Sequence, residues 1–217
     1  MQALLIAAKE LSHAKTRLAS LRAATRIELA RAMFEDVLAA AVAVTPAVRV
    51  AVISSDNDLL ESARRVGAEP IDEGYPRGLN AAVSLASSQL ARSGITTLAT
   101  LLSDTPLISA HDIHIVLEAA RNGGARSVTM VPSRDGRGTN VLVRQPAQVI
   151  APRFGIHSLA RHLAECERQQ VEGRILQLAG PALDLDEMAD LVEFTRLARA
   201  GRTLEELSRL RAELAMS

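Results

Sequence analysis

Short apolar runs alternate along this sequence with segments of helical periodicity, and this alternation restricts the fold more than any other feature. The run TTLATLLS at residues 96–103 carries no charge and is typical of a strand covered by helices on both faces. Comparable runs lie at residues 2–8, 48–55, 68–71, 127–132, 139–143 and 175–179. Strands that alternate with helices predict an α/β fold with a three-layer, mostly parallel sheet.

The same pattern predicts a single domain over residues 1–217, because no repeat, low-complexity segment or linker interrupts it. A helical stretch at about residues 202–215 ends the chain. Leucines at helical spacing mark one face of this stretch, namely Leu204, Leu207, Leu210 and Leu214. This leucine stripe fits either packing on the chain's own core or contact with a second copy in a homodimer.

Composition argues against several functions. The formal net charge is zero, whereas a general nucleic-acid-binding protein needs clustered positive charge. The single cysteine, Cys166, rules out an internal disulfide and a cysteine-based zinc site. No charged leader precedes a signal-like segment, and no apolar run approaches the ~20 residues that span a membrane. We therefore expect a cytoplasmic protein that binds neither nucleic acid nor membranes.

Ligands of α/β sheets bind where the loops that follow the strands converge, so the residues after each strand are the first candidates for a site. The only lysines of the chain, Lys9 and Lys15, follow the first predicted strand together with Arg17. Ammonium and guanidinium groups suit the phosphates of a nucleotide. An ordinary solvated loop, in which these side chains are exposed, is the alternative. The GxxxxGK[ST] phosphate-binding motif does not occur in the sequence.

Aspartates follow two further strands. Asp104 stands at the end of the run 96–103, where a carboxylate is costly unless a cation such as magnesium, held with nucleotide phosphates, compensates it. Asp184 and Asp186 alternate with leucines on a short extended segment, which puts both side chains on one face. Such a pair repels itself unless a cation or hydrogen-bond donors lie between the two groups. A turn or helix-capping aspartate is the alternative for Asp104.

Two segments suit an anion. DGRGTNVLV, residues 135–143, is either a hairpin turn or a glycine-softened loop that closes backbone and hydroxyl donors around an anion. In FGIHS, residues 154–158, Gly155 allows a close approach to a ligand. Ser158 would lie in the first turn of the next helix, where it either contacts an anion or caps the helix. His157 and His162 are more typical of surface or core histidines than of ligand contacts.

A third glycine-containing segment begins a helix. Gly78 precedes the predicted helix, and Asn80 lies in its first turn. The amide of Asn80 could contact a base or a ribose hydroxyl, or it could simply cap the helix.

Taken in order, AAKELSHAKTRLA, GLNAAV, the aspartate–X–proline at Asp104, GTNVLV, FGIHSLARH and LDLDEMADL resemble one known family. It is the 2-phospho-L-lactate guanylyltransferase family of deazaflavin coenzyme F(420) biosynthesis, and the resemblance runs from about Ala3 to Leu191. Members share the Rossmann-like fold of the molybdenum-cofactor nucleotidyltransferases. They transfer a guanylyl group from GTP to a small phosphorylated three-carbon acid, which is 2-phospholactate, phosphoenolpyruvate or 3-phosphoglycerate, and they release pyrophosphate.

The resemblance implies a role for each candidate residue. Lys15 and Asp104 would be catalytic. Asp104, with one or both of Asp184 and Asp186, would hold magnesium. The GTP phosphates would be bound by Lys9, Lys15 and Arg17, and the nucleoside by Gly78, Leu79 and Asn80. The acid would be bound by Thr139, Asn140, Gly155 and Ser158.

The resemblance also implies that GTP is a co-substrate, that one or two magnesium ions are needed, and that the product passes to a downstream transferase of the same pathway. Ser103 and Thr105 stand where family members often carry apolar residues. These two hydroxyls slightly favour 3-phospho-D-glycerate, which has a hydroxyl that phosphoenolpyruvate lacks. The alternatives are another sugar- or cofactor-nucleotidyltransferase and a non-catalytic nucleotide-binding relative.

Overall fold

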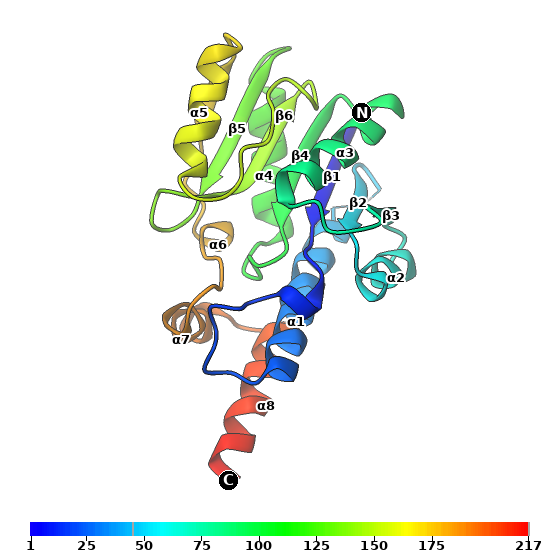
Figure 1. Cartoon of the computed structure of the whole chain (residues 1–217). Coiled ribbons are helices and arrows are strands. Elements are labelled where there is room, and N and C mark those ends of the chain that lie inside the picture. Colours follow the sequence, from blue (N-terminus) through cyan, green and yellow to red (C-terminus); the bar gives the residue numbers. More distant parts are fainter. Residues whose placement is uncertain (45, 217) are drawn as a thin grey trace.

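The computed structural model describes residues 1–44 and 46–216, with the side chains of the last helix described up to residue 212. Within these residues the strands form one seven-stranded sheet in the order β3-β2-β1-β4-β6-β5-β7 (Figure 1). The strands are β1 (Gln2–Ala7), β2 (Arg49–Ser54), β3 (Glu69–Asp72), β4 (Thr97–Leu102), β5 (Ser127–Pro132), β6 (Thr139–Gln145) and β7 (Glu172–Ile175).

All neighbouring strands are parallel except at β6, which runs antiparallel to both β4 and β5. The predicted α/β fold with a mostly parallel sheet is therefore confirmed. The β5–β6 pair is a hairpin, so DGRGTNVLV is a turn followed by a strand.

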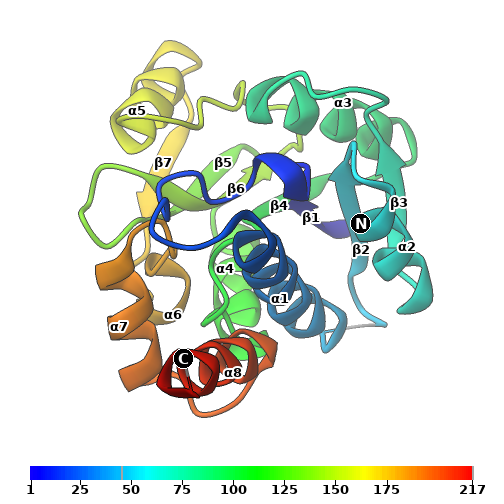
Figure 2. The same cartoon turned by 60° about the horizontal axis from the view of Figure 1, so that its bottom comes forward.

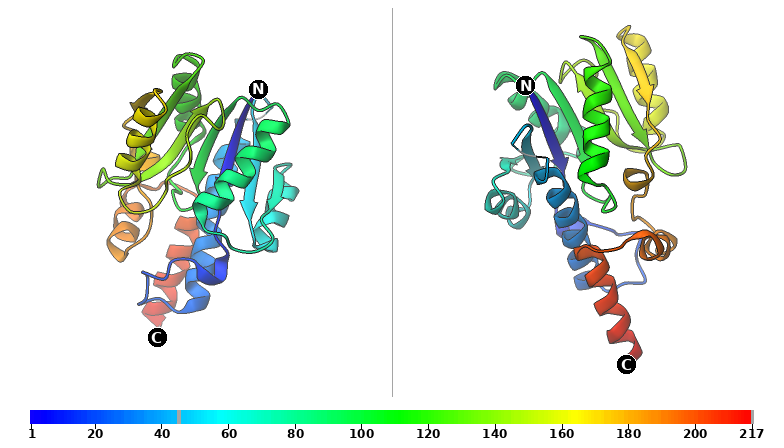
Figure 3. Two further views of the ribbon diagram at one scale, coloured as in Figure 1. Left: turned by 45° about the horizontal axis from the view of Figure 1, so that its top comes forward. Right: turned by 180° about the vertical axis from the view of Figure 1, so that it is seen from behind.

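Helices cover both faces of the sheet and complete the three layers (Figures 1 and 3). The strand β1 shows why both faces are covered, since Leu4 and Ile6 belong to one apolar cluster and Ala3 and Leu5 to the other, and all four are 0% exposed. On the first face lie α1 (Ala23–Val42), α2 (Asn57–Arg65) and α4 (Ala110–Arg121), and on the second α3 (Leu79–Arg92) and α5 (Ser158–Arg168).

The remaining elements lie beyond the carboxyl ends of the parallel strands. They are the 3-10 helix η1 (Leu11–His13), α6 (Ala179–Ala182), α7 (Met188–Leu197) and α8 (Arg202–Met216). Residues of α1, α7 and α8 enclose a third apolar cluster, which also contains Leu183 and Leu185. None of the helices in the described residues is long and apolar enough to cross a membrane.

The leucine stripe of α8 packs on this third cluster. Leu207 is buried in it, and Leu204 and Leu210 are partly buried against it, while the side chain of Leu214 lies outside the described residues. Asp36 of α1 holds the first turn of α8, because its carboxylate accepts the backbone N–H of Thr203 at 2.9 Å. The stripe thus contacts the chain's own core.

Candidate active site

The loops that follow the parallel strands surround a cavity of about 840 Å³. Figure 2 is viewed from the carboxyl ends of the parallel strands, and the blue loop after β1 lies across them. The loop after β1, the end of β4, the β5–β6 hairpin and residues 154–158 line the cavity together with residues 183–190. Gly78 and Asn80 are not part of the lining. The other predicted site residues are, namely Lys9, Lys15, Arg17, Leu79, Asp104, Thr139, Asn140, Gly155, Ser158, Asp184 and Asp186.

Lys15 is the central cation of this cavity. Its Nζ donates to Asp104 Oδ2 at 2.8 Å and to Asp186 Oδ1 at 2.9 Å, and only 7% of the side chain is exposed. Burial disfavours the charge, but Asp104 and then Asp186 outweigh it and hold the pKa of Lys15 above its ordinary value. The alternative, an exposed lysine on a solvated loop, is therefore wrong for Lys15. Its left-handed φ of 53° is strained for a lysine, and the two ion pairs help to hold it there.

The three aspartates differ in how their charge is balanced. Asp186 accepts from Lys15 and also from Arg17 Nη1 at 3.2 Å. Burial would raise the pKa of Asp186, but Lys15 and then Arg17 outweigh it and lower the pKa. Burial, and next the charge of Asp104, raise the pKa of Asp184. Oδ2 of Asp104 pairs with Lys15, but its Oδ1 is buried and has no hydrogen-bond partner among the described residues.

Buried carboxylate oxygens without a hydrogen-bond partner are suitable ligands for a hard divalent cation. No three or more histidine, cysteine, aspartate or glutamate side chains of the described residues are grouped so that they could hold a metal ion by themselves. Magnesium in proteins is usually held by one or two carboxylates together with water and substrate phosphates. The buried, unpartnered Oδ1 of Asp104 is the atom that most needs such a cation.

Two further cations remain accessible to a ligand. Lys9 is exposed, and its ammonium makes no hydrogen bond or ion pair within the part of the chain that the structure describes. The Arg17 side chain is 66% exposed despite its ion pair with Asp186. For these two residues the exposure fits phosphate contact and a solvated loop equally well.

Asn80 connects the start of α3 to the segment that precedes Ser158. Its Nδ2 donates to the carbonyl oxygen of Phe154 at 3.0 Å, and its Oδ1 accepts the N–H of Phe154 at 2.7 Å. Gly78 is the residue before α3 and has a φ of 84°, a conformation that glycine adopts without strain. The Asn80 amide therefore supports residues 154–158 in addition to any contact it makes with a nucleoside.

The turn of the β5–β6 hairpin is closed on itself. Asp135 accepts the hydroxyl of Ser133 at 2.6 Å and the backbone N–H of Arg137 at 2.9 Å, and these bonds, the first foremost, lower the pKa of Asp135. Gly136 has a φ of 71°, which the turn requires. Most polar groups of the turn thus bond to one another. Thr139, the first residue of β6, also lines the cavity, and its hydroxyl is not used by the turn.

Asn140 faces the aspartates, a role that its position in the sequence did not reveal. Its Nδ2 donates to the carbonyl oxygen of Pro181 at 3.0 Å and to Oδ1 of Asp184 at 3.1 Å. Asn140 therefore holds the segment that carries Asp184 against β6. The predicted contact of Asn140 with the acid stays a prediction.

Ser158 is the first residue of α5 and is buried, but it does not cap the helix. The residue before α5 is His157, in the left-handed conformation, and no side chain caps this helix. Among the described residues no hydrogen bond involves the Ser158 hydroxyl, which leaves it available to a ligand in the cavity. The free N–H groups at the start of α5 add partial positive charge at the same place.

The two hydroxyls that distinguish the Asp104 segment point to different surroundings. Thr105 is fully buried, and its hydroxyl donates to the carbonyl oxygen of Leu102 at 3.0 Å. Ser103 lines the cavity. Of these two hydroxyls, only that of Ser103 could therefore contact a substrate.

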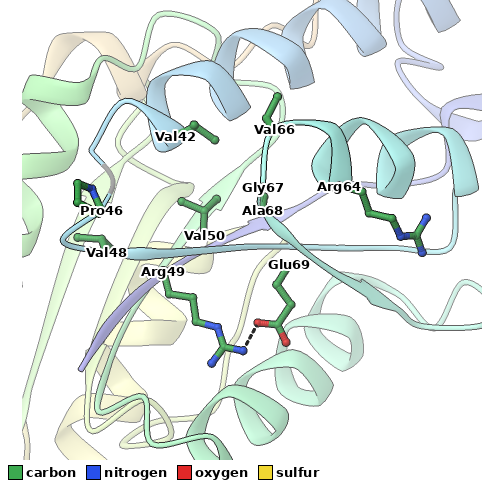
Figure 4. Close-up of a pocket in the computed structure, with 10 residues that line it drawn as sticks. All are labelled: Val42, Pro46, Val48, Arg49, Val50, Arg64, Val66, Gly67, Ala68 and Glu69. Atoms are coloured by element: carbon green, nitrogen blue, oxygen red, sulfur yellow. Dashed lines mark ion pairs between the residues drawn. The ribbon is translucent and has the colours of Figure 1, made fainter.

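A second hollow, of about 370 Å³, lies at the amino-terminal ends of the strands, beside the starts of β2 and β3 (Figure 4). Val48, Val50 and Val66 line it, and Arg49 forms an ion pair with Glu69 at 2.6 Å. None of the predicted site residues belongs to its lining.

The comparisons with known proteins agree on one family. Residues 1–216 match the family described as guanylyl transferase, CofC-like. The chain is 34% identical over 199 residues to a phosphoenolpyruvate guanylyltransferase of Sphaerobacter thermophilus, covering 91% of this chain and 94% of that protein. It is 34% identical over 203 residues to a 3-phospho-D-glycerate guanylyltransferase of Phenylobacterium zucineum, covering 92% of each.

A solved nucleotidyl transferase from Methanothermobacter has the same fold, with a TM-score of 0.65 at 12% identity over 89% of this chain and 95% of that one. The resemblance seen in the sequence is thus confirmed, and the protein is a nucleotidyltransferase. The chain belongs to the family of CofC-like guanylyl transferases.

Proposed function

We propose that this protein transfers the guanylyl group of GTP to a small phosphorylated three-carbon acid and releases pyrophosphate, as a step of deazaflavin coenzyme F(420) biosynthesis. The main support is the cluster in which the buried Lys15 bridges Asp104 and Asp186 beside the under-compensated Asp184. One ammonium among three carboxylates suits a polyphosphate together with a divalent cation. The relatives named as guanylyltransferases support GTP as the nucleotide.

Magnesium is the cation that this donor set fits. Asp104 and Asp184 would hold it, because Oδ1 of Asp104 has no partner among the described residues and burial raises the pKa of Asp184, whereas Asp186 pairs with both Lys15 and Arg17. Bound there with the GTP phosphates, it would supply positive charge to the leaving pyrophosphate.

The chain's own residues would position two anions that repel each other. Lys15 uses two of its three N–H donors on carboxylates, which leaves one for a phosphate oxygen. Lys9 and Arg17 would bind the remaining phosphates from the open side of the cavity. On the nucleoside side, Leu79 of the cavity lining would contact the guanosine, with Gly78 and Asn80 beside it at the start of α3.

The acid would lie between β6 and α5, where Thr139, Gly155 and Ser158 offer donors and Asn140 supports the aspartates behind them. An oxygen of its phosphate attacks the α-phosphorus of GTP, the bond from that phosphorus to the α–β bridging oxygen breaks, and pyrophosphate leaves. The attacking oxygen already carries charge, so no general base is needed and no covalent intermediate forms on the protein. Positioning and charge neutralisation supply the rate enhancement.

Ser103 is the residue of the Asp104 segment whose hydroxyl could distinguish the acids. With the Thr105 hydroxyl turned inward, only Ser103 still favours 3-phospho-D-glycerate over phosphoenolpyruvate. Pyrophosphate release from GTP should be measured with phosphoenolpyruvate, 3-phospho-D-glycerate and 2-phospho-L-lactate, and with a sugar phosphate as the control. We expect 3-phospho-D-glycerate to be used best and Ser103→Ala to reduce that preference. Release with the sugar phosphate alone would contradict the proposed function.

A further inference from the structure

His162 lies behind Thr139, and its hydrogen bonds determine which ring nitrogen carries a proton. The backbone N–H of Arg153 points at Nε2 of His162, at 2.8 Å. A backbone amide can only donate, so Nε2 must accept and carries no proton. The other ring nitrogen, Nδ1, lies 3.1 Å from Oγ1 of Thr139.

His162 is neutral at physiological pH. It is 0% exposed, and burial lowers its pKa from 6.5 to about 4. The charges of Arg144 on β6, Arg153 before Phe154 and Arg161 on α5 act in the same direction, while Glu165 on α5 opposes them. A neutral imidazole carries one proton, and that proton must therefore be on Nδ1. Phe154 packs edge-on against the ring at 5.1 Å between centroids and keeps it in place.

The proton on Nδ1 decides how Thr139 faces the cavity. Nδ1–H donates to the Thr139 oxygen, so the hydroxyl accepts on the inner side. Within the described residues this hydroxyl makes no other hydrogen bond, and Thr139 lines the cavity. Its own proton is therefore free to point into the cavity. With the opposite tautomer, Thr139 would give its proton to the ring and turn only lone pairs toward the cavity, which an anion repels.

We propose that His162 is a positioning residue of the acid subsite, because its Nδ1–H makes the Thr139 hydroxyl a hydrogen-bond donor toward the anionic substrate. The inference rests on the proposed function, in which Thr139 contacts the phosphorylated acid. It gives a role to a residue that does not touch the cavity itself. The backbone N–H of Arg153 fixes the tautomer of His162. The Nδ1–H of that tautomer donates to Thr139, whose hydroxyl proton then points into the cavity.

Two substitutions separate this role from simple support of residues 153–158. In H162N the shorter amide keeps an N–H near Nδ1 and loses the acceptor for Arg153. In H162Q the longer amide keeps an acceptor near Nε2 and loses the donor to Thr139. The KM for the acid should rise roughly two- to tenfold in H162Q, the usual effect of one hydrogen bond. It should rise less in H162N, and the KM for GTP should change in neither variant. An H162Q enzyme that uses the acid better than H162N would overturn the proposal.

A double-substitution cycle tests the link to Thr139. T139V should raise the KM for the acid roughly ten- to a hundred-fold, because an anionic oxygen loses its donor. Adding H162Q to T139V should then not raise the KM for the acid further. If the two substitutions instead raise this KM independently, so that their factors multiply, His162 does not act through Thr139. C166A, a change of another buried residue of α5, is the control for general loosening of that helix.

The tautomer can be measured without any activity. Proton–nitrogen correlation spectra of the full-length protein, with its histidines labelled with nitrogen-15, should show His162 neutral at pH 7 and protonated on Nδ1. A proton on Nε2 would overturn the inference even if the enzyme transfers guanylyl groups normally. Conversely, a protein with the Nδ1 proton that modifies no phospho-acid would contradict the proposed function alone.

Discussion

Asp184 and Asp186 are near neighbours in the sequence but have opposite electrostatic surroundings. The pKa of Asp184 is raised by burial and by Asp104, so its ionised form is disfavoured in the folded protein. The pKa of Asp186 is lowered, because Lys15 and Arg17 outweigh its burial. At neutral pH the charge of Asp184 therefore reduces the stability of the ligand-free fold, and that of Asp186 increases it.

This contrast predicts opposite stability effects from the same substitution. Without divalent cations at pH 7, Asp184→Asn should raise the thermal unfolding midpoint and Asp186→Asn should lower it. Asp184→Asn should nevertheless reduce activity and weaken the stabilisation that magnesium with GTP gives. Thermal unfolding of both variants, with and without magnesium and GTP, checks this. A lower midpoint for Asp184→Asn would show that its charge is already compensated.

Asp104 should be the carboxylate on which activity depends most. Asp104→Asn keeps the shape of the side chain and removes the charge, so turnover should fall by at least ~100-fold, the scale of one strong electrostatic contact. Asp58→Asn is the control, because among the described residues the Asp58 carboxylate bonds only to Arg31, in an ion pair at the surface. Initial rates at saturating GTP and acid would measure the difference, and near-normal turnover of Asp104→Asn would remove Asp104 from the reaction centre.

The neutral His162 predicts a pH dependence of stability. Its folded pKa of about 4 lies below the ordinary 6.5, so the unfolded chain binds its proton first as the pH falls. The stabilisation is complete above about pH 6.5 and is lost toward pH 4, with a magnitude on the order of 3 kcal/mol. Denaturant unfolding between pH 4 and 7 should therefore show a steeper loss for the natural protein than for H162Q, and parallel curves would contradict a buried neutral His162.

At the scale of elements, α3 and α5 hold residues 153–158 from two sides. Asn80 at the start of α3 binds both backbone groups of Phe154, and His162 on α5 accepts from Arg153. The nucleoside side and the acid side of the cavity therefore share one segment.

Asn80→Ala tests this connection. It removes both bonds to Phe154, so the KM for the acid should rise by roughly tenfold or more, as expected for two lost hydrogen bonds. Ser84→Ala is the control on the same helix, since within the part of the chain that the structure describes that hydroxyl donates only to the carbonyl of Asn80. Kinetics with each substrate varied separately give the answer. A loss confined to GTP would instead assign the Asn80 amide to the nucleoside alone.

Much of this arrangement could be predicted from local sequence. The charge-free run 96–103 and the runs at 2–8, 48–55, 68–71, 127–132 and 139–143 overlap six of the strands, because buried strands are apolar on both faces. The run 175–179 was wrong as a strand, since β7 is Glu172–Ile175, a partly exposed strand with polar residues that apolar runs do not detect. The antiparallel direction of β6 was also readable in principle, since the few residues between 132 and 139 cannot form a parallel crossover, which needs about a dozen. The burial of Lys15 and the hydrogen-bond partners of Asn140 and His162 could not be predicted from the sequence, because they depend on contacts between distant segments.

At the scale of the whole molecule, the last two helices support the reaction centre. Leu183 and Leu185 are buried in the cluster with α1, α7 and α8, and the aspartates that alternate with them face the cavity. The sequence LDLD thus combines two buried leucines with two aspartates that line the cavity. The carboxyl-terminal leucines thus serve the site of their own chain.

The most direct test of the account is the magnesium-dependent formation of a guanylylated acid from GTP. Phosphorus NMR should follow the protein with GTP and 3-phospho-D-glycerate or phosphoenolpyruvate. We predict that pyrophosphate and a new phosphorus–oxygen–phosphorus linkage to the acid appear together, that GTP is preferred to ATP, CTP and UTP, and that removing magnesium or introducing Asp104→Asn prevents both signals. Pyrophosphate release that does not require an acid, or formation of the product at an unchanged rate without a divalent cation, would contradict the account.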